Sequence, residues 1–482
     1  MSDIATDIGL LDRAWRKVTT LWRDMAERVV GAEDAETIAD QMRACLDGRG
    51  GEVSARNRAA KLAQAYMAAD AEGRVEFLRS MASFDSDTKA VRKAAEQLAA
   101  ANDAKAEVAA KAKLRRALES PRVRLLTQFT TIPDGMKFLV DLRTEMLRLA
   151  ATEASLGPLE SDLKGLLANY FDFGFLELKR IDWNSSAALL EKLVEYEAVH
   201  RIRGWRDLKN RLESDRRCYA FFHPRMPDEP LIFVEVALTQ GLADNVQRLL
   251  DEKAPVLDAA KADTAIFYSI NNCQRGLDGI SFGNFLIKRV VALLQIEQRN
   301  IRQFATLSPI PGFCRWLTGQ LAEGDTGLLS EDEAAALRLL APANAALPAP
   351  GDAVVAIITE ETPVQTLARL LARRGWLREE ALARAMEPIF LRACARYLMA
   401  EAARGNAKRA CDPVAHFHLS NGARVERLNW KGDTSDKGMK ESCALMVNYL
   451  YDPAKIEEYH EDYAGEGKRA AASAIRKLAR GG

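Results

Sequence analysis

The stretch Thr264–Gln295, TAIFYSINNCQRGLDGISFGNFLIKRVVALLQ, decides the fold class of this 482-residue chain. It opens with β-branched and aromatic residues and then reaches two asparagines, which predicts a buried strand over Thr264–Ile270. Apolar residues recur at helical spacing further on and predict a helix within Ile280–Glu297. Strands that alternate with helices indicate an α/β or α+β domain, so we expect one around this stretch.

The loop between this strand and helix is rich in glycine, at Gly276, Gly279 and Gly283. Glycine permits positive φ and close approach of a ligand to the backbone. The N-terminus of the following helix presents unpaired N–H groups and the positive end of the helix dipole. The loop therefore fits a pyrophosphate cradle, and a plain strand–helix turn is an equally good interpretation. Its glycine spacing matches neither G-x-G-x-x-G nor a G-K-[ST] loop.

Short apolar runs with turn residues at their ends predict further strands on both sides of this stretch. They lie at Cys218–Phe222, Leu231–Leu238, Phe304–Leu307, Val414–Leu419 and Ala423–Leu428, and a helix is predicted at Ala187–Tyr196. An Ala-rich helical block at about 318–404 interrupts the strands, with a Pro- and Ala-rich loop at 341–352 inside it. A charged helix is predicted after Lys455.

The first third of the chain is predicted to be helical. An apolar stripe at steps of three and four residues marks the first helix, which ends at Gly31 and presents Leu11, Trp15, Val18, Trp22, Met25 and Val29. Further Ala-rich helical segments are Arg56–Ala69, Thr88–Leu98, Ala104–Leu118 and Met136–Ala151. This pattern is typical of a helical bundle used for packing or oligomerisation, and we expect no catalytic site in it.

Composition excludes several classes of function. The chain carries 68 Lys and Arg against 68 Asp and Glu, and this balance argues against binding of a polyanion such as nucleic acid. No run approaches the ~18 apolar residues of a membrane span, and the start MSDIATDIGLLDRAW lacks the features of a secretory signal. The seven cysteines are scattered without a C-x-x-C pair, which suits free thiols in a reducing compartment. We therefore expect a soluble cytoplasmic protein.

Ser308 ends the predicted strand Phe304–Leu307 within FATLSPIPGFCRWL, residues 304–317. Pro309 favours an extended conformation at Ser308, and Pro309 and Pro311 stiffen the turn before the next helix. A hydroxyl held at a strand end in a rigid turn suits a catalytic or oxyanion-contacting role. The alternative is a serine that caps the following helix.

Two of the chain's five histidines stand two residues apart in DPVAHFHLSNGARVERLNW, residues 412–430. On the predicted strand His416 and His418 face the same way, which allows a zinc pair, although no compact carboxylate or cysteine set accompanies them. A single catalytic histidine is better motivated, because imidazole can donate a proton near neutral pH. A structural histidine stays an alternative.

The stretch RIRGWRDLKNRLESDRR, residues 201–217, is the most basic part of the chain's middle third. It contains acids as well, so it favours a solvated helix face over a nucleic-acid site. Some of its cations could still meet the phosphates of a nucleotide-bearing ligand.

Several uncommon strings of this sequence together resemble the malonyl-CoA decarboxylase family, in the family's order over roughly 216–451. They are RRCYAFFHPRMPDEPLIFVEVALT, TAIFYSIN, GLDGISFGNFLIKRVV, FATLSPIPGF, DPVAHFHLSNGARVERLNW and SCALMVNYLY. The resemblance implies an α+β architecture: an N-terminal all-helical oligomerisation domain at 1–171, then a GNAT-like α/β catalytic domain at 172–482 with a helical insertion at about 318–404. The TAIFYSI strand would lie beside the substrate, and Phe304–Ser308 would diverge from it to make room for the acyl-thioester.

The resemblance also implies the site residues. Ser308 in the SPIPGF turn and His418 in the FHL motif would be the catalytic pair, with Asn421 and Tyr451 as neighbours and no role for His416. The loop that would hold the CoA pyrophosphate consists of Asp278, Gly279, Ile280, Ser281, Phe282, Gly283 and Asn284. Many relatives have an acidic residue where this chain has Ser281, so any role of that carboxylate is lost or has moved here.

The implied activity is that of a carboxy-lyase, which converts malonyl-CoA to acetyl-CoA and CO₂ through an enolate that the Ser/His pair stabilises and protonates. The thioester supplies the electron sink, so we expect no cofactor and no metal, and CoA is part of the substrate. The alternatives are a GNAT-type acyl-CoA-dependent acyltransferase and a non-catalytic acyl-CoA sensor. The expected partners are malonyl-CoA, acetyl-CoA and further copies of the chain in a homotetramer, with no nucleic acid and no membrane.

Overall fold

The computed structural model describes Trp22, Met25 and residues 37–47, 51–280, 286–324, 326–340, 361–373 and 375–480. The chain divides into two compact units. The N-terminal unit comprises Met1–Glu177, Phe221–Ile232 and Asn272–Gly283, and the C-terminal unit comprises Leu178–Ala220, Phe233–Asn271 and Asn284–Gly482. The N-terminal unit therefore includes two short segments from the middle of the chain, and the domain boundary at 171/172 stays a prediction.

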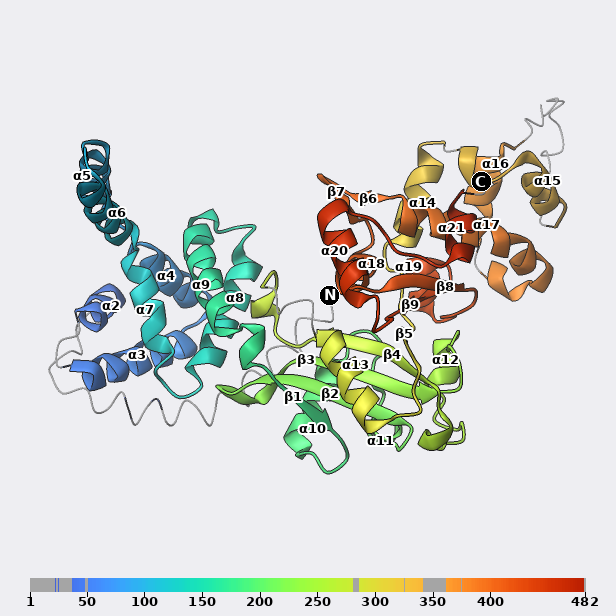
Figure 1. The fold of residues 1–482 in the computed structure, drawn as a ribbon, viewed down its shortest axis with the longest axis horizontal. Helices are drawn as coiled ribbons and strands as arrows, with labels where there is room; N and C mark the ends of the chain where they lie inside the picture. Colours follow the sequence, from blue (N-terminus) through green and yellow to red (C-terminus); the bar gives the residue numbers. More distant parts are fainter. Residues whose placement is uncertain are drawn as a thin grey trace, which may run out of the picture. The chain divides into compact units, whose positions relative to one another are not determined.

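Helices make up most of the N-terminal unit, as predicted (Figure 1). They are α2 (Ile38–Leu46), α3 (Gly51–Ala68), α4 (Ala71–Ala82), α5 (Thr88–Ala99), α6 (Ala104–Leu118), α7 (Pro121–Phe129), α8 (Gly135–Leu149), η1 (Ala154–Leu156), α9 (Gly157–Tyr170), η2 (Phe173–Phe175) and η4 (Arg275–Leu277). The side chains of Asp70, Asp87 and Asp103 accept backbone N–H groups at the starts of α4, α5 and α6, which explains where these helices begin.

Aromatic side chains form part of the core of this unit. The ring of Trp22 meets Phe138 edge-on with centroids 5.5 Å apart, and its Nε1 donates to the Pro133 carbonyl at 2.9 Å. Of the apolar stripe predicted for the first helix, Trp22 and Met25 are helical here, and the other members and Gly31 lie outside the described residues.

A seven-stranded mixed sheet organises the rest of the chain, in the order β1-β2-β3-β4-β5-β9-β8. Its strands are β1 (Glu177–Ile181), β2 (Arg216–His223), β3 (Met226–Thr239), β4 (Thr264–Asn272), β5 (Gln303–Thr306), β8 (Arg424–Asn429) and β9 (Met446–Leu450). A separate small pair joins β6 (Ala402–Ala403) and β7 (Asn406–Ala410). The strands predicted at 218–222, 231–238, 264–270, 304–307 and 423–428 are confirmed.

Helices accompany this sheet in the C-terminal unit. They are α10 (Ala187–Tyr196), α11 (Trp205–Arg211), α12 (Val246–Leu249), η3 (Ala259–Lys261), α13 (Leu286–Glu297), α14 (Phe313–Ala322), η5 (Thr326–Leu328), α15 (Glu331–Leu340), α16 (Pro363–Ala372), η6 (Trp376–Arg378), α17 (Glu380–Met399), α18 (Pro413–Ser420), α19 (Asp436–Ser442), α20 (Ile456–Glu466) and α21 (Ser473–Arg480). Helices α14 to α17 pack on one another as a group (Figure 1). The helical insertion predicted at about 318–404 covers α15 to α17 and the second half of α14. The loop predicted at 341–352 lies outside the described residues.

The strands β4 and β5 carry the feature that positions the site. They pair in parallel from Thr264↔Gln303 to Phe267↔Thr306, and β4 then continues to Asn272. On its other side β5 pairs with β9 at Ala305↔Leu450, and this antiparallel register continues at Ser308↔Val447. The last backbone hydrogen bond to β4 is that from the Leu307 N–H to the Phe267 carbonyl, at 3.0 Å. Pairing between β4 and β5 thus ends at the place where divergence of the two strands was predicted, and the predicted order of a helical part followed by a mixed α/β part is confirmed.

The strand predicted at Val414–Leu419 is wrong, because these residues belong to helix α18. Asp412 caps its N-terminus through Oδ1, which accepts the N–H groups of Val414 and Ala415 at 2.9 and 3.0 Å. Pro413 occupies the first helical turn, and Gly422 follows the helix with φ of 80°. These helix signals override the apolar run that suggested a strand.

Candidate active site

Ser308 lies where the backbone leaves β5, in an extended bridge to β9. Its N–H donates to the Val447 carbonyl at 2.9 Å, and the Val447 N–H donates back to the Ser308 carbonyl at 3.0 Å. The side chain is 5% exposed, so its hydroxyl depends on protein partners. This placement agrees with the predicted hydroxyl at a strand end, and the side chain does not act as a helix cap, because α14 begins at Phe313 with Gly312 as its N-cap.

His418 meets Ser308 from the last turn of α18. The distance from His418 Nε2 to Ser308 Oγ is 3.1 Å, although the two residues lie 110 positions apart in the chain. On the other side of the ring, His418 Nδ1 and the Tyr451 hydroxyl are 2.7 Å apart. The imidazole also stacks on Tyr449, with centroids 4.6 Å apart and an interplanar angle of 24°. The ring is thus held by two hydrogen bonds and one aromatic face.

A hydrogen-bond chain extends from this pair into the sheet. The Ser308 hydroxyl donates to Thr306 Oγ1 at 2.8 Å, and Thr306 Oγ1 also accepts the Tyr449 N–H at 3.0 Å. Because the Ser308 proton is used in this way, Ser308 Oγ is free to accept the Nε2–H of His418. Nδ1 then lacks a proton and accepts the Tyr451 hydroxyl. The chain of donors therefore runs from Tyr451 through His418 and Ser308 to Thr306.

Burial determines the protonation state of this site. His418 is 3% exposed, and burial lowers its pKa to about 3, because a charged imidazolium would lose its hydration there. Burial likewise raises the pKa of Tyr451 well above its ordinary value. Both groups are therefore neutral at neutral pH, and the site holds polar hydrogen atoms without carrying a net charge.

Asp412 connects the two segments that carry the pair. While Oδ1 caps α18, Oδ2 accepts the N–H of Gly312 at 3.2 Å in the turn that follows Ser308. The Tyr397 hydroxyl donates to the same oxygen at 3.4 Å. Asp412 is 1% exposed, and burial raises the pKa of its carboxyl group. This residue was not singled out from the sequence, although a D-P pair before an apolar run is a helix-start signal.

The zinc pair considered for His416 and His418 does not exist in the structure. Two residues apart on a helix, the two rings point to different sides, and His416 Nδ1 lies 2.9 Å from the Tyr463 hydroxyl. No group of three or more potential metal ligands occurs among the described residues. Asn421 is a local cap, since its Nδ2 donates to the Phe417 carbonyl at 2.8 Å, whereas Tyr451 does contact His418.

The loop predicted to hold the pyrophosphate is described in part. Asp278, Gly279 and Ile280 belong to the N-terminal unit, and Ser281, Phe282, Gly283 and Asn284 lie outside the described residues. Gly279 has φ of 72°, and a Cβ on it would lie 3.3 Å from Lys164 Nζ. The expected positive φ is thus found at Gly279.

Gly276 lies against the protein's own backbone and not in open space, so the ligand approach expected for it stays a prediction. A Cβ on this residue would meet the Val140 carbonyl oxygen at 1.8 Å, so a side chain does not fit. The Gly276 carbonyl accepts Arg143 Nη1 at 2.7 Å, and Arg143 also pairs with Glu160 at 2.8 Å. The start of the loop is therefore anchored to α8.

Two of the scattered cysteines come together in space. Cys314 Sγ and Cys443 Sγ are 2.9 Å apart, in α14 and just after α19. All cysteines of the described residues are free thiols, as predicted. The pairing of these two was not visible in the sequence, because 129 positions separate them.

Fold and site together define a class of protein: an α/β enzyme with a buried hydroxyl–imidazole pair at the point where the pairing of two parallel strands ends. Comparison with known protein families identifies the family within this class. The model of the malonyl-CoA decarboxylase N-terminal domain matches residues 84–171, and that of the malonyl-CoA decarboxylase C-terminal domain matches residues 174–481.

Individual relatives agree with this match. The goose (Anser anser anser) protein named "Malonyl-CoA decarboxylase, mitochondrial" is 41% identical over 344 residues, which cover 69% of this chain and 64% of the relative. The rat (Rattus norvegicus) protein of the same name is 38% identical over 351 residues, 70% of this chain and 67% of the relative. This chain thus spans about two thirds of the length of these relatives.

A solved structure covers more of the chain. The crystal structure of malonyl-CoA decarboxylase from Rhodopseudomonas palustris is 40% identical, covers 92% of this chain and 100% of that chain, and superposes with a TM-score of 0.78. The corresponding enzyme from Agrobacterium vitis has 39% identity and the same TM-score. The chain belongs to the malonyl-CoA decarboxylase family, a family of carboxy-lyases.

Proposed function

We propose that this chain decarboxylates malonyl-CoA to acetyl-CoA and CO₂ and that Ser308 and His418 are its catalytic pair. The observation that carries the proposal is the 3.1 Å contact between Ser308 Oγ and His418 Nε2. Family membership supports the substrate, and the end of the pairing between β4 and β5 supports a place for an acyl-thioester beside this pair.

Decarboxylation of malonyl-CoA requires the protein to stabilise an enolate and to supply a proton. Cleavage of the bond between the carboxylate and the α-carbon releases CO₂ and leaves its electron pair in an enolate, whose charge develops on the thioester oxygen. A well-placed hydrogen-bond donor aimed at that oxygen stabilises the transition state by about 3–4 kcal/mol. The α-carbon must then receive one proton to give acetyl-CoA.

His418 is the proposed proton donor, through Nε2–H. The donor is the neutral imidazole, since burial lowers the pKa of His418 to about 3. Its Nε2–H can protonate the enolate carbon because that carbon is more basic than the imidazolate left behind. The imidazolate formed in this step can take a proton at Nδ1 from Tyr451 across their 2.7 Å hydrogen bond, and one proton from solvent then restores the neutral pair. Ser308 is proposed to orient the malonyl carboxylate or the proton path through its hydroxyl group.

The proposed reaction uses no cofactor and no metal. The thioester carbonyl of the substrate accepts the electron pair that decarboxylation leaves behind, so the electron sink comes with malonyl-CoA. We propose that the loop at Asp278–Asn284 holds the CoA pyrophosphate, and the positive φ of Gly279 and the nearby Lys164 ammonium group support this assignment.

The experiment that tests the proposal is incubation of the full chain with malonyl-CoA, with acetyl-CoA measured by chromatography. We expect acetyl-CoA in equimolar amount with CO₂. Parallel incubation of acetyl-CoA with amines tests the acyltransferase alternative, which would yield free CoA and an acetylated amine. Absence of acetyl-CoA above the enzyme-free rate would refute the decarboxylase proposal.

We further propose a cytoplasmic homotetramer. The free cysteines suit a reducing compartment, and no described helix is long and apolar enough to cross a membrane. Assembly through the N-terminal unit follows from the family resemblance, which implies an oligomerisation role for this helical part. Light scattering tests the tetramer, and fractionation of cells tests a cytoplasmic against a mitochondrial location.

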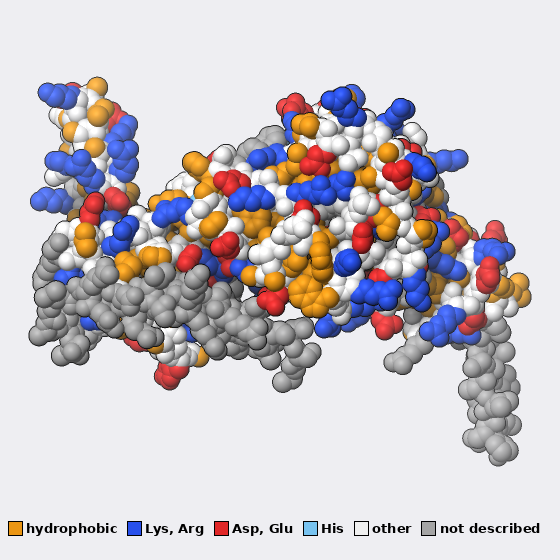
Figure 2. Space-filling model, turned by 90° about the horizontal axis from the view of Figure 1, so that it is seen from below, with side chains coloured by type: hydrophobic (Ala, Val, Ile, Leu, Met, Phe, Trp, Pro, Cys, Tyr) orange, Lys and Arg blue, Asp and Glu red, His pale blue; other side chains and the backbone are white. Residues whose placement is uncertain are grey.

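The proposed partners do not include nucleic acid. Figure 2 shows Lys and Arg side chains interspersed with Asp and Glu over much of one face, in agreement with the equal numbers of both signs in the sequence. Such a mixed surface attracts polyanions weakly. A gel-shift titration with duplex DNA and RNA at physiological salt is expected to show no complex.

A further inference from the structure

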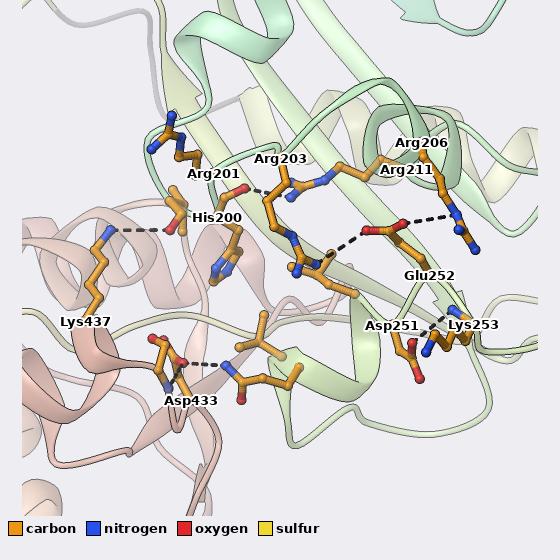
Figure 3. A pocket seen from close by; sticks show the side chains of 15 residues that line it. His200, Arg201, Arg203, Arg206, Arg211, Asp251, Glu252, Lys253, Asp433 and Lys437 are labelled. Atoms are coloured by element: carbon orange, nitrogen blue, oxygen red, sulfur yellow. Dashed lines mark hydrogen bonds and ion pairs between the residues drawn. The ribbon is translucent and has the colours of Figure 1, made fainter.

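The C-terminal unit contains a pocket of about 630 Å³ that is not lined by Ser308 or His418. Its walls come from α11 and the loop before it, from α12 and the residues after it, and from the start of α19 and the loop before it (Figure 3). This volume is in the range of small-molecule sites. The pocket includes much of the basic stretch that begins at Arg201, to which the proposed decarboxylation assigns no role.

Positive charge exceeds negative charge in the lining of this pocket. The cations are Arg201, Arg203, Arg206, Arg211, Lys253 and Lys437, and the acids are Asp251, Glu252 and Asp433. Glu252 serves two cations at once, Arg203 at 3.6 Å and Arg206 at 3.3 Å. Within the described part of the chain, Arg201, Lys253 and Lys437 pair with no carboxylate; Lys437 Nζ donates to the Ala198 and Val199 carbonyls. The pocket therefore holds uncompensated positive charge.

Arg211 belongs to the floor of the pocket and is already neutralised. It is 2% exposed and forms hydrogen bonds to Asp207 at 2.9 Å and Glu235 at 3.0 Å. Its Nη2 donates to the His200 carbonyl at 2.7 Å. Arg211 is therefore not a free contact for a ligand, and it holds the backbone that presents His200.

His200 presents an unused polar atom to the pocket. Its Nε2 is buried without a hydrogen bond of good geometry in the described structure, although the ring interacts with the Tyr268 backbone. Figure 3 shows this ring in the space bounded by Arg203, Asp433 and Lys437. Burial, with the nearby Arg211, lowers the pKa of His200 to about 4, so the ring is neutral at neutral pH. A buried polar atom without a partner costs free energy that a ligand group can recover.

We propose that this pocket binds a small anion that carries phosphate groups, with Arg201, Lys253 and Lys437 as its cationic contacts and His200 Nε2 as a hydrogen-bond partner. Phosphate groups match several unpaired cations because each phosphate offers multiple charged acceptor oxygens. Val246 and Leu250 add apolar surface for an uncharged part of the same molecule. A nucleotide combines these properties, either as the adenosine 3′-phosphate part of a CoA ester or as a separate molecule.

Binding of defined probes to the full chain tests this proposal without any turnover. Inorganic pyrophosphate, ADP and adenosine 3′,5′-bisphosphate are titrated by calorimetry at low salt. The double variant Arg201→Glu/Lys437→Glu is expected to bind these probes at least about tenfold more weakly than the unchanged chain. Lys209→Glu is the matched control, because Lys209 is exposed on α11 and does not line the pocket, and its affinity should equal that of the unchanged chain.

The change at Lys437 could disturb the loop at Ala198 and Val199, whose carbonyls it contacts, so a further variant is needed. Lys253→Glu removes one unpaired cation without touching that loop and should weaken binding in the same direction. The site is overturned if no probe binds at millimolar concentration, or if Lys209→Glu weakens binding as much as the pocket variants.

The two sources of the anion differ in kinetics. If the pocket takes the nucleotide end of the substrate, adenosine 3′,5′-bisphosphate raises KM for malonyl-CoA without changing kcat, and Lys253→Glu raises KM as well. If it takes a separate nucleotide, ADP changes kcat while KM stays constant. Either pattern supports the site, and the calorimetric result stands even if malonyl-CoA is not the substrate.

Discussion

Asp412, the N-cap of the helix that carries His418, accepts a hydrogen bond from the backbone N–H of Gly312 at 3.2 Å in the turn that follows Ser308. One carboxylate thus fixes the start of α18 with one oxygen and the turn after Ser308 with the other. The distance between the two catalytic candidates therefore depends on a residue that touches neither of their side chains.

Replacement of Asp412 by alanine is expected to lower both stability and turnover. The helix loses its cap, which costs about 1 kcal/mol, and buried N–H groups lose their acceptor, which adds about 1–3 kcal/mol. Urea unfolding and kcat measure the two effects. Asp103→Ala is the control, because Asp103 caps the exposed start of α6; it should cost about 1 kcal/mol and leave kcat unchanged. Equal kcat in both variants would contradict a positioning role for Asp412.

Replacement of His418 by asparagine or Ser308 by alanine should reduce kcat by about 10²–10⁴-fold. His416→Asn is the control for the first change, because His416 is two residues away and contacts Tyr463. Its kcat should stay close to that of the unchanged protein. Steady-state decarboxylation, with circular dichroism to verify folding, makes the comparison. Similar losses in the His416 and His418 variants would remove His418 from the catalytic pair.

Tyr451 and Tyr449 permit a matched test of the hydrogen bond to Nδ1. Both rings contact His418, but the Tyr449 hydroxyl is buried without a hydrogen-bond partner in the described residues, whereas the Tyr451 hydroxyl lies 2.7 Å from Nδ1. Tyr451→Phe should lower kcat, because the imidazole loses the partner that fixes its tautomer. Tyr449→Phe should leave kcat unchanged and should not reduce stability. The opposite ranking would show that the tyrosine hydroxyl is not needed.

The pH dependence should reflect a histidine that is neutral when folded. The pKa of His418 is about 3 in the folded protein against an ordinary value of 6.5. As pH falls from about 6.5 to about 3, the unfolded chain binds a proton at this site and the folded chain does not, so the free energy of unfolding decreases. Above pH 6.5 the ring is neutral in both states, and this contribution no longer varies.

Two measurements check this behaviour. The acid-induced loss of stability should be smaller in His418→Asn than in the unchanged protein when unfolding is followed in urea across this range. In the unchanged protein, kcat should show no decline that follows protonation at pH 6.5. An acid limb of kcat at that pH would indicate that His418 is charged in the substrate complex.

Mild oxidation should join Cys314 to Cys443, whose sulfur atoms are 2.9 Å apart. Hydrogen peroxide converts one thiolate to a sulfenic acid with release of hydroxide, and the second thiol then displaces water to form the disulfide. The hydrogen bond with the Cys443 thiol lowers the pKa of Cys314. Cys314 is therefore the thiol that we expect peroxide to oxidise first. Peptide mass spectrometry should find one cross-linked pair. Cys411, which is exposed, serves as the control thiol and should not appear in a cross-link with either residue.

Local signals predicted most of the fold. The run TAIFYSI forms β4, and the helix predicted at Ala187–Tyr196 has the same bounds as α10. Alternation of apolar residues and turn residues is a property of neighbouring positions, so it can be read from the sequence. The error at Val414–Leu419 arose because an apolar run of this length fits a strand and a buried helix equally well, and the cap at Asp412 decided between them.

The two residues of the candidate pair could be predicted from the sequence, but the hydrogen bonds that hold them in place could not. Ser308 stood out because of its strand end and prolines, and His418 because of the motif that contains it. The roles of Thr306, Asp412 and the Cys314–Cys443 pair depend on contacts across many positions of the chain, and a single sequence carries no signal for such pairs. The excess of cations around His200 was hidden for the same reason, because three segments that lie far apart in the sequence supply it.

The start of α18 at Asp412 and Pro413 has a consequence for how this segment can change in evolution. Each residue of a helix advances the side-chain direction by about 100°. A substitution between the cap and His418 leaves the direction of the imidazole unchanged, whereas deletion of a single residue would turn it away from Ser308. Among functional descendants, this short segment should therefore accept substitutions that fit around the buried Ala415 far more readily than any change in length.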